Sequence, residues 1–287
     1  MCLLAKVSNL AIRVSNEILL PIFEKNITKM DFDIKCDGSW VTTADTQAHN
    51  TLINELPRLY PLPVLSEELS VSEQEEILNQ PSPSYWCIDP LDGTSNYTQG
   101  IPYWCISIAL IIDGEIELGV VYDPNRDECF ASMKGKTTTL NGMPIQKIAD
   151  NKISKLSQTM GLIDFKRLRP EIATALVINQ PYRSQRSFGA SALDLCWIAV
   201  NRCQIYLHGK QMLWDHAAGI IILSNAHGKL ATFDNGFVFK NDLEPKTVIA
   251  ASTTVMMDKW QNYFNCIYHP DFEKVSNQSK TSNVVRL

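Results

Sequence analysis

The sequence predicts a mixed α/β protein whose sheets are covered by helices. Apolar residues recur at three- and four-residue intervals near the start of the chain, which indicates amphipathic helices. Short apolar runs such as residues 85–88 are typical of strands that are buried on both faces. In the second half, strand and helix patterns alternate, as they do in α/β folds. We therefore expect one domain over residues 1–287, with intimate subdomains of about 1–150 and 151–287.

Two amphipathic helices are expected before the first strand. The apolar positions of residues 7–22 share one helical face, and this helix should end or kink near Pro21, which cannot donate a backbone hydrogen bond. Residues 44–56 repeat the pattern, and Thr43 is well placed to cap the first turn of this second helix. Asp45 is therefore expected near a helix N-terminus.

The strands of the first half run towards acidic residues. Residues 64–65 and 85–88 are apolar, and each run is followed at once or within a few positions by Asp or Glu. Residues 106–122 indicate two strands joined at Asp113 and Gly114, a pair that suits the positive φ angles of a tight hairpin turn. The first two strands should therefore carry carboxylates to the ends of a sheet.

The second half is expected to alternate between strands and helices. The expected order is a strand near Leu156, helices over 170–179 and 191–200, a strand over 205–207, a helix over 217–225, strands near Leu230 and over 248–250, and a helix over 255–264. The tail after Val275 is rich in Ser, Asn and Lys and is expected to be loose.

Composition excludes several classes of protein. With 45% hydrophobic and 20% charged residues, the chain is typical of a soluble globular enzyme. Its net charge is −5 and its Lys and Arg residues are scattered, which argues against a nucleic acid polymer as a partner. No apolar run approaches the ~20 residues that span a bilayer and no signal peptide is recognisable, so we expect no membrane contact and a cytoplasmic location. The eight cysteines contain no C-x-x-C pair and should be reduced thiols.

Carboxylates gather where strands are expected to stop. The three segments are VLSEEL with Glu67 and Glu68, WCIDPLDGTSNY with Asp89 and Asp92, and LWDHAAG with Asp215. Each acid alone has an ordinary explanation, because surface pairs, turns and helix caps commonly use Asp and Glu. None of the five histidines falls in a zinc-binding spacing, so surface or packing roles are expected for them.

The DPLDGT segment is more specific than the other two. Pro90 restricts the backbone, and Gly93 lets the chain approach a ligand closely. Magnesium prefers oxygen ligands and is usually held by a few carboxylates together with substrate phosphate oxygens. Residues 94–97 can open a short helix, whose free N–H groups would bind a phosphate. The segment thus predicts adjacent metal and phosphate sites.

The motifs VTTAD, SEE, DPLDGTSNY followed by GIPYWCISIALIIDG, and LWDHAAG occur in an order that resembles the inositol monophosphatase superfamily of magnesium-dependent, lithium-sensitive phosphatases. The resemblance covers the chain from about Leu10 to the end of the last helix. It implies the α+β sugar-phosphatase fold, which is a layered αβαβα sandwich, and a homodimer. It also implies that a small phosphorylated substrate is hydrolysed by metal-activated water, without a protein nucleophile.

Carried over by motif, the resemblance implies a site for two to three Mg²⁺ ions. One ion would be held by Glu67, Asp89 and the carbonyl of Leu91, and a second by Asp89, Asp92 and Asp215. Glu67 would also lie near a third, weaker ion. Two metals spaced ~4 Å apart can stabilise the attacking and leaving oxygens of an in-line displacement.

The resemblance also implies catalytic and substrate-binding roles. Thr94 and Asp45, together with the metal ligand Glu67, would activate the attacking water. The N–H groups of Gly93 and Thr94 would hold the phosphate, beside Asp92 and Asp215. Ser191 corresponds to a substrate-facing backbone position, whereas Asp194 is interpreted as a helix-surface or capping residue.

The substrate remains open between two classes. The residues SNY and GIP after the DGT motif resemble the inositol phosphatase branch and favour an inositol monophosphate or a related polyol or sugar phosphate. Seven residues before Asp215, however, His208 replaces the acid that grips ring hydroxyls in that branch, and Lys210 adds positive charge. A basic loop there would suit a second phosphate, as in a 3'(2'),5'-bisphosphate nucleotide. The alternative interpretation of residues 208–210 is an exposed turn.

A different class of function is a non-catalytic protein that binds metal and a polyanion, because a fold alone never guarantees activity. Every proposed ligand is present in the sequence, which favours the enzyme.

Overall fold

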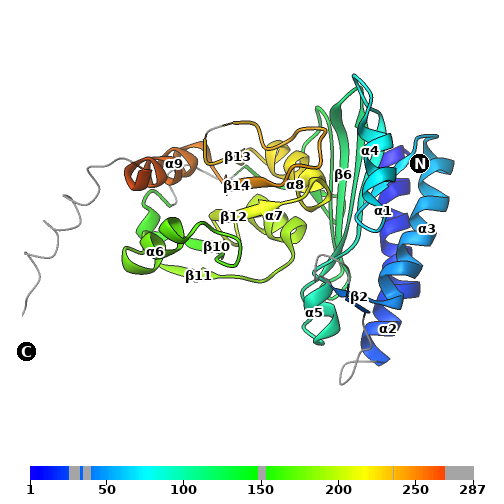
Figure 1. The fold of residues 1–287 in the computed structure, drawn as a ribbon, viewed down its shortest axis with the longest axis horizontal. Helices are drawn as coiled ribbons and strands as arrows, with labels where there is room; N and C mark the ends of the chain where they lie inside the picture. The colour runs from blue at the N-terminus through cyan, green and yellow to red at the C-terminus, as the bar shows by residue number, and fades with distance from the viewer. Residues whose placement is uncertain (26–32, 35–39, 148–152, 235, 269–287) are drawn as a thin grey trace, which may run out of the picture.

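The computed structural model describes residues 1–25, 33–34, 40–147, 153–234 and 236–268. Figure 1 shows five layers. Helices α1 (Leu3–Val14) and α3 (Thr43–Leu59) form the first, a large sheet containing β6 (Glu115–Asp123) the second, and helices α7 (Ser191–Ala199) and α8 (Leu213–Asn225) the third. A smaller sheet containing β12 (Ile205–Gln211) is the fourth, and helices α6 (Pro170–Ile178) and α9 (Thr254–Tyr268) form the fifth. The expected layered αβαβα arrangement is therefore confirmed. The expected loose tail after Val275 lies outside the described residues.

The first helix continues past Pro21, so the expected end at that residue is wrong. After α1 comes a π-helical turn, η1 (Ser15–Leu19), and then α2 (Leu20–Lys25), which contains the proline. A proline ring clashes with the carbonyl four residues earlier, here that of Glu17. Because Glu17 lies in the wider π-helical turn, the helix can pass the proline without ending.

The second helix, α3, begins with a reciprocal cap. Its N-cap residue is Thr42 and not Thr43, which corrects the sequence-based expectation by one position. The Thr42 hydroxyl accepts hydrogen bonds from the N–H groups of Ala44 and Asp45, and the Asp45 carboxylate accepts one from the Thr42 N–H. Such a capping box fixes both the helix start and the Asp45 side chain.

The large sheet has seven strands in sequential order, and only its first pair, β3 with β4, is parallel. Its other strands are β3 (Val64–Ser66), β4 (Tyr85–Asp92), β5 (Cys105–Ile112), β7 (Glu128–Met133), β8 (Thr139–Leu140) and β9 (Met143–Pro144). The expected hairpin is present as β5 and β6, and both Asp113 and Gly114 have positive φ at its turn. The remaining elements of this half are the paired β1 (Asp33–Ile34) and β2 (Trp40–Val41), α4 (Val71–Leu78) and α5 (Thr94–Thr98).

Small residues bring the middle helices close to their neighbours. A Cβ atom on Gly119 of β6 would lie 2.7 Å from the carbonyl oxygen of Ala218 in α8. Another on Gly219 of α8 would lie 2.5 Å from the Leu195 side chain in α7. Part of the LWDHAAG motif therefore serves packing, since α8 must fit against a sheet on one side and α7 on the other.

The smaller sheet has the strand order β11, β10, β12, β14, β13. These strands are β10 (Met160–Asp164), β11 (Ser184–Arg186), β13 (Lys229–Ala231) and β14 (Lys246–Ala251), together with β12. The strand expected near Leu156 is wrong, because Leu156–Gln158 forms a 3₁₀ turn and the strand begins at Met160. The helix expected from residue 217 begins four residues earlier, at Leu213.

Several chain segments meet where strands of the two sheets end. The carboxyl ends of β4, β10 and β12 meet the first turns of α5, α7 and α8 there. One buried core, which includes Leu65, Leu162 and Ala250, spans residues from both halves of the chain. Among the helices described, none combines the length and the apolar character needed to cross a membrane. Seven cysteines are free thiols, and Cys36 lies outside the described residues.

Candidate active site

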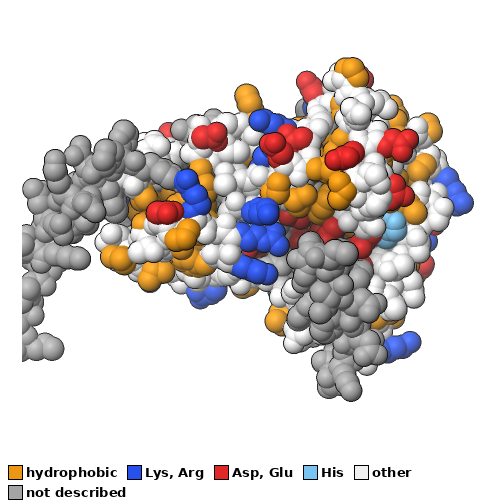
Figure 2. All heavy atoms as spheres, in the orientation of Figure 1, with side chains coloured by type: hydrophobic (Ala, Val, Ile, Leu, Met, Phe, Trp, Pro, Cys, Tyr) orange, Lys and Arg blue, Asp and Glu red, His pale blue; other side chains and the backbone are white. Residues whose placement is uncertain are grey.

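A cavity of about 350 Å³ opens where these segments meet. Figure 2 shows a recess with acidic side chains at its floor and Lys and Arg side chains on one rim. The cavity is lined by most of the residues singled out from the sequence, namely Glu67, Asp89, Leu91, Asp92, Gly93, Thr94, Ser191, His208 and Asp215. Acids from the turn after β3, from β4 and from α8 therefore share one cavity, although they are separated by up to about half of the chain.

Two buried acids lie at the irregular end of β4. Asp89 is 3% exposed and Asp92 is 6% exposed. The pairing of β4 with β5 shifts register between these two residues, so that both side chains reach the cavity. The Leu91 N–H donates to Asp89 Oδ1 at 3.0 Å, and Gly93 follows with φ of 95°. Only a residue without a Cβ adopts that conformation readily.

The start of α7 fixes the Asp92 carboxylate. The N–H of Ser191 donates to Asp92 Oδ1 at 3.1 Å, and the N–H of Ala192 donates to Oδ2 at 2.7 Å. The first N–H groups of a helix have no partner within the helix and favour a negative charge. The Ser191 backbone, expected to face substrate, thus contacts Asp92, and Ser191 also lines the cavity.

Asp215 lies in the first turn of α8, where it accepts a hydrogen bond from the Met212 N–H at 2.8 Å through Oδ2. The ordinary explanation of this acid, a helix cap, is therefore correct in part. Asp215 also lies on the cavity wall.

Thr94 lines the cavity, and Asp45, which does not line it, contacts the Thr94 side chain. The Thr94 hydroxyl lies 3.2 Å from Asp45 Oδ1 and 3.0 Å from the Leu91 carbonyl oxygen, and it can donate to either. Asp45 is 2% exposed, and its other oxygen is held by the Thr42 N–H at 2.7 Å. The α3 cap therefore holds this carboxylate in place, and the Thr94 hydroxyl contacts it from the cavity side.

Burial and mutual repulsion raise the pKa values of the acids. The pKa of Asp89 is raised well above its ordinary value by burial and by the charges of Glu67, Asp92 and Asp215. Burial and Asp215 raise the pKa of Asp92 to about 7, although N–H donors partly oppose this. Burial and Glu67 raise the pKa of Asp215 to about 6. Such a cluster disfavours full ionisation unless positive charge is added.

The donor set fits a hard divalent cation, because it consists of carboxylate oxygens and the Leu91 carbonyl. In the conformation described, no three Asp, Glu, His or Cys side chains are already arranged to hold a metal ion, as far as the described residues go. The acids therefore line an open site, in which ion binding would require side-chain rotations.

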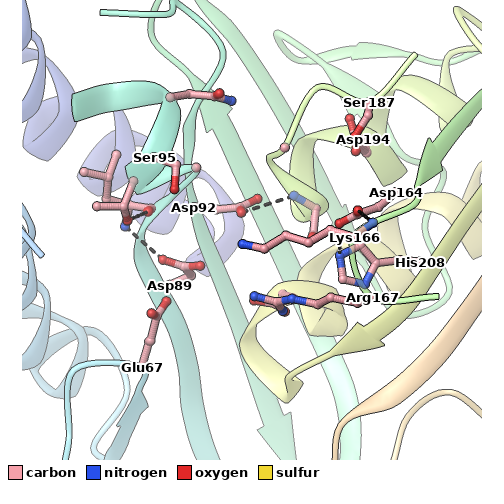
Figure 3. A pocket seen from close by; sticks show the side chains of 17 residues that line it. Glu67, Asp89, Asp92, Ser95, Asp164, Lys166, Arg167, Ser187, Asp194 and His208 are labelled. Carbon is pink, nitrogen blue, oxygen red and sulfur yellow. Dashed lines mark hydrogen bonds and ion pairs between the residues drawn. The ribbon is translucent and has the colours of Figure 1, made fainter. Parts of the chain in front are cut away.

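A basic wall faces these acids, and sequence reasoning missed two of its members. Lys166 and Arg167 follow β10, and Figure 3 shows their side chains extending across the cavity towards Glu67, which follows β3, and the acids of β4. The Lys166 N–H donates to Asp164 Oδ1 at 2.8 Å, and Arg167 Nη1 donates to the Lys210 carbonyl oxygen at 3.1 Å. The letters FKRLR were visible in the sequence, but misplacing β10 hid their position at a strand end.

His208 belongs to the same wall. It lies in β12 and is 6% exposed, and its Nε2 lies 2.9 Å from Asp164 Oδ2. Burial alone would raise the pKa of Asp164, but the His208 contact lowers it below its ordinary value. The interpretation of residues 208–210 as an exposed turn is therefore wrong, because all three belong to β12. Lys210 is exposed and does not line the cavity.

A family model described as "Inositol monophosphatase family" matches residues 3–268. The chain belongs to the inositol monophosphatase family. It is 31% identical to "Nus factor SuhB" of Pasteurella multocida over 235 residues, which cover 79% of this chain and 85% of that one. It is 36% identical to "Inositol monophosphatase 1" of Solanum lycopersicum over 197 residues, which cover 66% and 71%.

A solved structure described as 2'AMP-bound SaIMPase-II shares the fold, with a TM-score of 0.78 at 22% identity, and the match covers 97% of this chain and all of the other. The same staphylococcal protein has also been solved with inositol monophosphate bound. Membership of the inositol monophosphatase family and the shared fold agree with the order of the acidic motifs.

Asp194 differs from its expected place. It is 6% exposed, not on the helix surface, and its Oδ1 accepts a hydrogen bond from the Tyr103 hydroxyl at 2.7 Å. Burial raises its pKa well above the ordinary value, with Asp92 adding to the effect. The surface or capping interpretation is therefore wrong, because α7 lies between two sheets and has hardly any exposed face.

Proposed function

We propose that this member of the inositol monophosphatase family hydrolyses a small phosphate monoester with Mg²⁺ as cofactor. The supporting observation is the cluster of Glu67, Asp89, Asp92 and Asp215 around one cavity, where mutual repulsion raises the pKa of several members. A purely structural role would not favour four acids in one place, because like charges that lie close together in a partly buried site repel one another. A site that binds cations and a phosphate gives each acid a function.

The metal ligands would be Glu67, Asp89, Asp92, Asp215 and the Leu91 carbonyl, for two to three ions. Bound there, Mg²⁺ would supply Lewis-acid stabilisation and a lower pKa for bound water. The ions would also remove the repulsion that now raises the carboxyl pKa values.

The chain itself would position the water and the phosphate. The Thr94 hydroxyl would hold the attacking water and pass its proton towards Asp45, whose carboxylate is fixed by the α3 cap. The N–H groups of Gly93 and Thr94, which begin α5, would bind phosphate oxygens. Ser191 would act mainly through Asp92, because its N–H orients that carboxylate. His208 would face the rest of the substrate.

Two substrate classes fit the cavity. The SNY and GIP residues favour an inositol or other polyol monophosphate. The basic wall of Lys166, Arg167 and His208 favours a substrate with a second phosphate, such as a 3'(2'),5'-bisphosphate nucleotide, because the charged side chains of Lys166 and Arg167 can pair with a second anion. The ligands of SaIMPase-II, inositol monophosphate and 2'AMP, motivate the inclusion of both classes in one assay.

The test is a phosphate-release panel with Mg²⁺ that contains an inositol monophosphate, 2'AMP and a 3',5'-bisphosphate nucleotide. Turnover of any of them should collapse in Glu67→Gln and persist in Glu68→Gln, since only the first of these adjacent acids lines the cavity. Turnover of the bisphosphate alone would replace the polyol phosphate by the nucleotide as the substrate class. No turnover of any compound, or equal loss in both variants, would refute the hydrolytic proposal and favour a non-catalytic role.

A further inference from the structure

A second polar cavity lies at the opposite end of the strands in the smaller sheet. The catalytic cavity is at the end of β12 that contains His208, whereas Ile205 at its other end pairs with Ala251 of β14. Beyond Ala251, the Ser252 N–H donates to the Gln204 carbonyl oxygen, and the chain enters α9. A cavity of about 270 Å³ opens at this junction, away from the acids described above.

We propose that this second cavity binds a phosphate-class anion. Its lining includes the basic residues Lys147, His227 and Lys229 and the hydroxyl residues Ser252, Thr253 and Thr254, and none of the described residues that line it is an acid. Neither Lys147 nor Lys229 forms an ion pair with another described residue. A local excess of positive charge on a chain with net charge −5 favours an anionic ligand.

The amino end of α9 points into the same place. This helix has 15 residues, and its first turn is closed by hydrogen bonds from the Met257 N–H to the Thr253 carbonyl oxygen and from the Met256 N–H to the Thr253 hydroxyl. Within the described part of the chain, the N–H groups of Thr254 and Val255 have no acceptor. Free N–H groups and the helix dipole favour an anion at this end.

Ser252 provides an independent indication of a ligand. Residue Ser252 is 4% exposed and lines the cavity, and its hydroxyl makes no hydrogen bond with any described residue. A hydroxyl that has no protein partner and is reached from the cavity is free to donate a hydrogen bond to a molecule bound there. An anion held between the helix N-terminus and Lys229 would accept this hydroxyl's hydrogen bond.

The two anion sites can be separated by removing metal. In metal-free protein the acid cluster repels anions from the catalytic cavity, whereas the second cavity needs no metal. We would titrate inorganic phosphate at constant ionic strength into ¹⁵N-labelled, metal-free full-length protein. The amide signals of Ser252, Thr254 and Val255 are expected to shift and saturate, and chloride at equal ionic strength should leave them unchanged.

Three variants test whether Lys229 and Ser252 bind the phosphate. Lys229→Gln is expected to weaken phosphate binding about tenfold, the usual effect of losing one charge-assisted hydrogen bond, and Ser252→Ala to weaken it severalfold. Lys136→Gln removes the same charge from an exposed lysine outside the cavity and should leave binding unchanged. Equal weakening by Lys229→Gln and Lys136→Gln, or shifts confined to the signals of residues 164–168 beside the catalytic cavity, would overturn the proposal.

Discussion

Asp215→Asn is expected to stabilise the metal-free protein at neutral pH, although it removes a proposed metal ligand. The pKa of Asp215 in the folded protein is about 6 and that of Asp92 is about 7, whereas both are near 3.8 in an unfolded chain. Between pH 4 and 7 the folded state therefore binds more protons than the unfolded state. Under these conditions the free energy of unfolding falls as the pH rises.

The magnitude follows from the same shifts. One pKa unit corresponds to about 1.4 kcal/mol, so the raised pKa of Asp215 represents on the order of 3 kcal/mol at pH 7. Asp215 is partly exposed and its titration is linked to that of its acidic neighbours, so we expect a gain of on the order of 1–2 kcal/mol from the substitution. The asparagine oxygen can still accept the Met212 N–H, so the helix cap survives.

The assay is thermal unfolding at pH 5 and pH 7.5, with and without Mg²⁺. A gain of 1–2 kcal/mol raises the Tm by roughly 2–8 °C in a chain of this size. The gain should be present at pH 7.5 without metal, should be small at pH 5, and should be lost in Mg²⁺, which stabilises the wild type more than the variant. Asp258→Asn, which neutralises an exposed acid on α9, should change none of these values. A lower Tm for metal-free Asp215→Asn at both pH values would refute the proposed repulsion.

Three further outcomes are expected. Gly209→Ala should raise the KM for bisphosphate substrates more than the KM for monophosphates in steady-state kinetics. The reason is that the new Cβ would lie 1.9 Å from the Arg167 carbonyl oxygen and displace the basic wall. Equal effects on both KM values would contradict this role. Thr94→Val should lower kcat by about 100-fold or more with the circular dichroism spectrum unchanged, and Thr94→Ser should restore most activity. Tyr103→Phe should reduce the free energy of unfolding in urea by about 1–3 kcal/mol, because it leaves buried Asp194 without its hydroxyl partner. An unchanged free energy of unfolding would show that another group satisfies that acid.

The local features of the fold were readable from sequence because they depend on short-range chemistry. Asp113 and Gly114 form the expected hairpin turn, since few residues tolerate positive φ there. The strand misplaced near Leu156 shows the limit. An apolar residue alone does not distinguish a 3₁₀ turn from a strand edge, and the pairing of β10 with β12 decides the strand.

The acids of the candidate site were found from sequence because they stand in compact motifs at strand ends. The approach of Thr94 to Asp45 was expected only through the family resemblance, since 49 positions separate them. Lys166 and Arg167 were missed because their place on the cavity depends on the end of β10. Asp194 was misjudged because helical periodicity identifies a buried face only when another face is exposed, and α7 has almost none.

The most direct test of the metal-dependent mechanism is the anomalous diffraction of crystals soaked in Mn²⁺, which scatters more strongly than Mg²⁺ and accepts the same oxygen ligands. Peaks are expected in the catalytic cavity within coordination distance of Asp89, Asp92 and Asp215, and they should be weaker or absent in Asp92→Asn crystals. Anomalous peaks for fully occupied Mn²⁺ at other positions, with no peak among these acids, would contradict the mechanism.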